Sequence, residues 1–91
     1  MAAKFPDDIV ARIEREFGAG ARAGIELVLQ PMLESGDAWR VVRCVLVLAA
    51  GDIARLRHYV EQATRDYRDV IYWAEYDASG RIADYTQPFG E

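Results

Sequence analysis

Apolar residues near the N-terminus recur every three or four positions, which places them on one face of a helix. The pattern starts after Pro6, which suits the first helical position because it has no backbone N–H to leave unpaired. Asp7 and Asp8 follow, and carboxylates near a helix N-terminus interact favourably with the helix dipole. Gly18 ends the pattern. We therefore predict a helix over Pro6–Phe17.

A second apolar stripe predicts a helix over Ala21–Leu33. Three glycines in the preceding stretch, GAGARAG, indicate a loop or a loosely formed helix start. Pro31 removes one backbone donor and disfavours the helical conformation at Gln30, so we expect a kink or a break there. The next segment, Ser35–Asp37, has the composition of a loop.

The segment Ala38–Ala50 is apolar almost all round, which is typical of a helix at the centre of a core. Arg40 and Arg43 are its only charged residues. Its four valines are also compatible with a buried strand, because β-branched residues are common in strands. The length of the segment favours a helix. Gly51 and Asp52 then provide a helix stop and an N-cap for the next helix.

The longest pattern starts at Ile53 and has apolar residues at alternating spacings of three and four. It continues without interruption through Thr64–Asp66, so one helix can run to about Tyr76. In the alternative, the helix breaks near Asp66, and this residue caps a second helix. Both interpretations use the same apolar stripe, which consists of Ile53, Leu56, Val60, Ala63, Tyr67, Val70 and Ala74.

The end of the chain combines a turn with a tail that contains apolar residues. Asp77–Gly80 has turn composition, and Ile82 lies in the segment after it, so we expect part of the tail to dock on the helices. The prediction is one all-α domain over residues 1–91, a compact bundle of four or five helices with a docked irregular C-terminal tail. The alternative is an α+β fold, in which Ala38–Ala50 is a strand and VIYWAEY and RIADYTQ form a C-terminal β-hairpin.

Composition and charge restrict the classes of function. The 91 residues are 52% hydrophobic and 29% charged, which is the balance of a packed globular domain. A net charge of −4 counts against a general binder of phosphate backbones, so nucleic acid is not the expected partner. The N-terminus lacks the apolar core of a signal peptide, and the longest apolar run, Cys44–Gly51, is too short to cross a bilayer. We expect a cytoplasmic protein with no membrane partner and no cofactor.

The segment Asp66–Tyr76, DYRDVIYWAEY, is the most informative part of the sequence. On a helix it presents a second face beside the apolar stripe, and this face begins polar and ends aromatic. Tyrosine, tryptophan and arginine are enriched at binding hot spots. We therefore expect an interface that forms a homodimer or binds another protein. The predicted interface residues, two of them in the tail, are Asp66, Asp69, Tyr72, Trp73, Tyr76, Tyr85 and Phe89.

Two other interpretations of this segment stay open. In the first, its aromatic residues are core residues that pack on Pro6–Phe17 and on the tail. In the second, carboxylates near the aromatic rings form a cluster that acts in catalysis or binds a divalent cation. The sequence has no other catalytic constellation, so an enzyme is the alternative and not the main hypothesis. The cluster comprises Asp66, Asp69, Glu75 and Asp77.

Four further side chains have ordinary structural interpretations. Cys44 lies in an apolar run and is expected to be a small buried residue. His58 is the only histidine and is expected on a partly exposed helix face, without the partners of a catalytic triad. One cysteine and one histidine cannot supply a zinc ligand set. Arg40 and Arg43 are expected to form ion pairs at the edge of the bundle, with Asp66 or Asp69 as partners across the core.

The segment Trp39–Asp77 contains the stretch DYRDVI, followed after one residue by WAEYD. In this segment the chain resembles small bacterial proteins of uncharacterised function that share a C-terminal DYRDVI-x-WAEYD-like motif. The likeness covers a little under half of the chain. It implies a bacterial source, and it implies no reaction and no cofactor.

Overall fold

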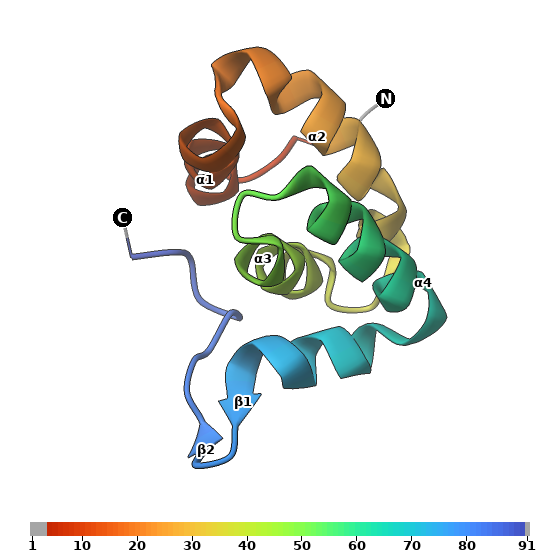
Figure 1. Ribbon diagram of the computed structural model, residues 1–91, viewed down its shortest axis with the longest axis vertical. Helices are drawn as coiled ribbons and strands as arrows, with labels where there is room; N and C mark the ends of the chain where they lie inside the picture. The colour runs from red at the N-terminus through yellow and green to blue at the C-terminus, as the bar shows by residue number, and fades with distance from the viewer. Residues whose placement is uncertain (1–3, 91) are drawn as a thin grey trace.

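Helices dominate the computed structural model, which describes residues 4–90 (Figure 1). Helix accounts for 71% of the structure, so the predicted all-α bundle is confirmed. No helix within residues 4–90 is both long and apolar enough to cross a membrane. The elements are, in order, α1 (Asp7–Phe17), η1 (Ala19–Ala21), α2 (Arg22–Leu29), η2 (Gln30–Glu34), α3 (Ala38–Ala49), α4 (Ile53–Glu75), β1 (Tyr76–Asp77) and β2 (Gly80–Arg81), where η denotes a 3₁₀-helix.

The helix boundaries follow from local backbone chemistry. Gly18 ends α1 with a φ of 90°, a conformation that glycine adopts without steric penalty. Near Pro31 the chain changes from the α-helix α2 to the tighter 3₁₀-helix η2. The Asp52 carboxylate caps α4, because it accepts a hydrogen bond from the Arg55 backbone N–H at 3.1 Å. The predicted helix stop, interruption and N-cap are therefore confirmed.

α3 is the central element of the core, and the other helices surround it (Figure 1). Residues 41–46 of α3 are all buried, and the most extensive contacts of this helix are with α4. A segment that is apolar on every side needs this position, because any exposed side would leave apolar surface in water. The alternative that Ala38–Ala50 forms a strand is wrong.

α4 bends sharply at Asp66. The φ of −156° and ψ of 101° at this residue are extended and not helical, so residues 53–65 and 67–75 are two helical segments that meet at one residue. The Asp66 carboxylate accepts a hydrogen bond from the Arg68 backbone N–H at 3.1 Å and thereby caps the second segment. The predicted break is confirmed over the unbroken helix. The apolar stripe faces inward along both segments, except at its start. Ile53 is exposed, whereas these later members are buried: Leu56, Val60, Ala63, Val70 and Ala74.

After α4 the chain turns and returns along the core. β1 and β2 pair antiparallel, with Tyr76 opposite Arg81, so the hairpin alternative is right about the turn. It is wrong about the extent of the strands, because residues 70–75 are helical. The tail, residues 82–90, runs back beside α3 toward α1 (Figure 1). Tyr85 and Phe89 in the tail pack against the core, which confirms the docked irregular tail.

Candidate functional site

The predicted site residues in the second segment of α4, residues 67–75, lie on two sides of this helical segment. Val70 and Ala74 hold one side against the core. Arg68 and Asp69 are exposed on the other side, where the aromatic residues also lie. Glu75, the last residue of the helix, faces inward and is fully buried. The segment DYRDVIYWAEY is therefore not one site but an outer surface and an inner polar group.

The outer surface is formed by Tyr72, Trp73 and Tyr76, which we call the aromatic face. Their exposed fractions are 61%, 44% and 37%. The ring of Tyr72, in the last turn of α4, stacks on the ring of Tyr76, the residue directly after this helix, with centroids 5.3 Å apart. Trp73 meets the ring of Tyr59 edge to face at 6.2 Å. These contacts orient the rings and leave much of their surface uncovered.

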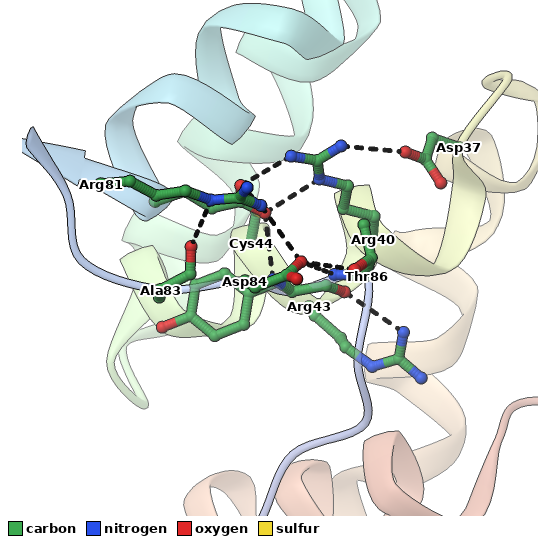
Figure 2. A network of polar contacts seen from close by, with 10 residues as sticks. Asp37, Arg40, Arg43, Cys44, Arg81, Ala83, Asp84 and Thr86 are labelled. Carbon is green, nitrogen blue, oxygen red and sulfur yellow. Dashed lines mark hydrogen bonds and ion pairs between the residues drawn. The ribbon is translucent and has the colours of Figure 1, made fainter.

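The inner group, Glu75, holds the start of the tail. Arg40 on α3 donates two hydrogen bonds to its carboxylate, at 2.9 and 2.6 Å. Arg81 donates a third at 3.0 Å, and the backbone N–H of Tyr85 donates a fourth at 3.1 Å. Figure 2 shows Arg40 and Arg81 reaching toward each other from different elements. Four donors compensate the burial of this charge, which would otherwise be strongly destabilising.

A second ion pair holds the end of the tail. Arg43 on α3 donates to both carboxylate oxygens of Asp8 on α1, at 2.8 and 3.2 Å. The same carboxylate accepts a hydrogen bond from the Phe89 backbone N–H at 3.0 Å, and Arg43 reaches the Tyr85 carbonyl oxygen at 3.4 Å. The guanidinium of Arg12 lies 4.6 Å from the centre of the Phe89 ring. We call the two ion pairs, Arg40–Glu75 and Arg43–Asp8, the tail clamp.

The tail clamp keeps its two carboxylates ionised. The hydrogen bonds from Arg43 are the main cause of the lowered pKa of Asp8, and burial opposes them only in part. Burial acts to raise the pKa of Glu75, but the hydrogen bonds from Arg40 and from the Tyr85 N–H outweigh it, so this pKa is also lowered. Both ion pairs are therefore charged at neutral pH.

The ion pairs predicted for the two arginines of α3 are present, but their predicted partners, Asp66 and Asp69, are wrong. The bend at Asp66 directs both of these carboxylates to the outer side of α4, and the true partners are Glu75 and Asp8. The pairing of Glu75 and Asp8 with these arginines was not predicted from the sequence. Two arginines one turn apart in an apolar helix were the available signal, since buried arginines require buried carboxylates.

The four carboxylates of the cluster hypothesis do not come together. Asp66 caps a helical segment, Asp77 accepts hydrogen bonds inside its own turn, and Glu75 belongs to the tail clamp. Asp69 is exposed. Among residues 4–90, no group of three or more His, Cys, Asp or Glu side chains is placed to hold a metal ion. These residues provide no shared site for catalysis or for a cation.

The single cysteine and the single histidine lie as predicted. Cys44 is fully buried, and burial raises the pKa of its thiol to about 12, so the thiol stays protonated at neutral pH. His58 lies on an exposed helix face, where its ring meets Tyr59 edge to face at 5.1 Å. Both residues have the ordinary surroundings of structural side chains.

Two predicted interface residues, Tyr85 and Phe89, belong to the docked tail and are only partly exposed. Their rings meet edge to face at 6.0 Å. Both pack against the core below the tail clamp. Of the predicted interface, the aromatic face and Asp69 are therefore the exposed part.

Comparison of the chain with protein-family models, with curated proteins and with solved structures gives no match. The resemblance in the segment Trp39–Asp77 therefore stays a prediction. The function has to be argued from the geometry of the site itself.

Proposed function

We propose that this protein is a small interaction module that associates with a second copy of itself through the aromatic face. The exposure of Tyr72 and Trp73 in the last turn of α4, and of Tyr76 directly after it, is the observation that carries the proposal. Such side chains bury large areas with little loss of conformational freedom, which is why they dominate binding hot spots. A cytoplasmic location is part of the same proposal.

The C-terminal tail leaves the aromatic face exposed. The tail contains its own aromatic residues, and it follows shortly after the helix that carries the aromatic face. The tail clamp instead binds it to α1 and α3. An apolar surface that its own chain does not cover is the kind of surface that partners use.

The charges beside the aromatic face favour a second copy in antiparallel orientation. Arg68 lies one turn before Tyr72, and Asp77 directly follows Tyr76. A two-fold axis between positions 72 and 73 brings Arg68 of one copy opposite Asp77 of the other, at both ends of the contact. Antiparallel helix dipoles favour the same arrangement. In this arrangement the charges at the two ends of the face are therefore complementary.

The size of the aromatic face indicates a reversible dimer. A stable interface of standard size buries roughly 800 Å² on each partner. The described residues expose 5367 Å² in total, so such an interface would cover about 15% of the surface. Three rings supply only part of this area. We expect a dissociation constant on the order of 10–100 μM.

Sedimentation velocity over a range of roughly 5–500 μM tests the proposal. The wild type should pass from monomer to dimer, and Trp73→Ala should weaken the association about tenfold or more. Leu27→Ala is the matched control, because Leu27 is an exposed apolar residue on α2, outside the aromatic face. The proposal fails if the wild type stays monomeric, or if the control weakens the association as much as Trp73→Ala does.

A further inference from the structure

The bend in α4 has no helix-breaking residue. Sharp helix kinks usually occur at proline or glycine, and neither is present in Thr64-Arg65-Asp66-Tyr67-Arg68. Only Asp66 departs from helical φ and ψ. Its carboxylate is bonded to the Arg68 side chain at 3.0 and 3.1 Å, but this pair is exposed and holds the bend weakly. The local sequence thus permits a straight helix, and contacts with the rest of the protein maintain the bend.

The apolar stripe of α4 is compatible with such a straight helix. Its spacing of three and four residues continues across the bend from Ile53 to Ala74, as in a seam of three heptads. In the bent form, both halves of the stripe contribute buried residues to the core, Leu56, Val60 and Ala63 before the bend and Val70 and Ala74 after it. In a straight helix, the two halves of the apolar stripe lie on the same side of the helix, so each half can still be buried against a core.

The contacts that hold the chain after the bend are made to the part before the bend. We call residues 4–65 the body and residues 67–90 the exchange segment. Glu75 of this segment binds Arg40, the Tyr85 carbonyl binds Arg43, and the Phe89 N–H binds Asp8. Each contact therefore joins a group of the exchange segment to a group of the body. The body of a second copy offers the same groups.

We infer that the body surface under residues 67–90 is an interaction surface, and that its second occupant is the exchange segment of another copy. In this domain-swapped dimer, Asp66 becomes helical and α4 runs straight into its partner. The ion pairs and hydrogen bonds that opening breaks within one chain form again between the two copies, and helical hydrogen bonds form at the former bend. The entropy of association and the loss of the Asp66 cap oppose the exchange, so the swapped dimer forms at high protein concentration. The aromatic face moves with the exchange segment, and its Trp73 ring meets Tyr59 of the body. The exchange does not require a second copy to bind this face, so the inference is independent of the proposed function.

The role of Asp66 as the hinge of the exchange is tested in a Trp73→Ala background, where association through the aromatic face is weakened about tenfold or more. Asp66→Ala deletes one cap from each chain and favours the straight helix, so it should raise the dimer association constant about tenfold or more. Asp66→Asn keeps a capping oxygen and should behave like the background protein. After refolding at roughly 0.5 mM, the dimer should survive dilution for hours, because its dissociation requires the core to open. Equal dimer fractions in the two Asp66 variants, or a dimer that dissociates at once, would overturn the inference.

The exchange itself is tested by mixing two complementary chains. Arg40→Ala leaves the buried Glu75 without its main partner, and Glu75→Ala leaves Arg40 with the half-exposed Asp37 carboxylate in place of its buried partner. A swapped dimer of the two has one intact ion pair and one site from which both charges are gone, so neither charge is orphaned. Native mass spectrometry after joint refolding should show mixed dimers above the statistical proportion. A statistical proportion, or an absence of mixed dimers, contradicts exchange of this segment.

Discussion

The two aromatic groups near the C-terminus are similar in composition but differ in exposure. Tyr85 and Phe89 are docked, whereas Tyr72 and Trp73 are exposed. The difference lies in the backbone that carries them. A helix satisfies its own N–H and C=O groups, but an irregular tail has to find other partners for these groups. Two N–H groups of the tail find them in the two carboxylates of the tail clamp.

This comparison shows that aromatic content alone does not identify an interface. The tail is bound through backbone groups and charged side chains, and its rings are covered as a consequence. Tyr72 and Trp73 of the aromatic face lie on a helix that satisfies its own backbone groups, so no such requirement draws their rings into the core, and they stay exposed. Substitutions in the two regions should therefore differ in their effects on the free energy of unfolding and on association.

The largest effect is expected from the buried end of the clamp. Glu75→Ala should lower the free energy of unfolding by about 3 kcal/mol, because the largely buried Arg40 then keeps only the half-exposed carboxylate of Asp37, at 3.4 Å, as a partner among the described residues. Urea denaturation measures the loss. The control is Asp69→Ala, which removes an exposed carboxylate from the same helical segment and should leave the stability close to that of the wild type. Equal losses in the two variants would show that the clamp does not stabilise the fold.

A smaller effect is expected from acid. The pKa values of Asp8 and Glu75 are lowered in the folded state, so their stabilisation is complete above their unfolded values, near pH 4, and is lost as the pH falls through the folded values. Asp8→Asn should cost about 1–2 kcal/mol at pH 7, and this difference should shrink toward pH 2. Urea midpoints across this range measure it. A constant difference would contradict the ionised clamp.

The comparison of the rings themselves gives a third prediction. Phe89→Ala should lower the free energy of unfolding by about 1–2 kcal/mol, because the ring is partly buried and lies beneath Arg12. Tyr72→Ala should cost less than about 0.5 kcal/mol, because most of this ring is exposed. Thermal unfolding of both variants measures the difference. The reverse order would contradict the distinction between docked rings in the tail and exposed rings in the aromatic face.

Much of the fold could be predicted from local sequence. The stop at Gly18, the change at Pro31 and the cap at Asp52 each depend on the conformational preference of one residue or of its neighbours. The bend at Asp66 could not be decided, because the local sequence allows both a straight and a broken helix. Contacts made far away in the chain select the broken one.

The candidate site was predictable on its outer side only. Helical spacing was enough to place Tyr72, Trp73 and Tyr76 beside the apolar stripe and not within it. The clamp was missed because its two ion pairs each join residues 35 positions apart. Their pairing depends on the direction of the chain after the bend, which no local pattern encodes.

The central claim, that the aromatic face is buried by a second copy, is tested most directly by the fluorescence of Trp73. The chain has two tryptophans, so Trp39→Phe leaves Trp73 as the only tryptophan emitter. The emission maximum should shift to shorter wavelength as the concentration rises through the range in which the dimer forms, because the indole leaves water. A dimer that forms while the emission of Trp73 stays unchanged would contradict the claim.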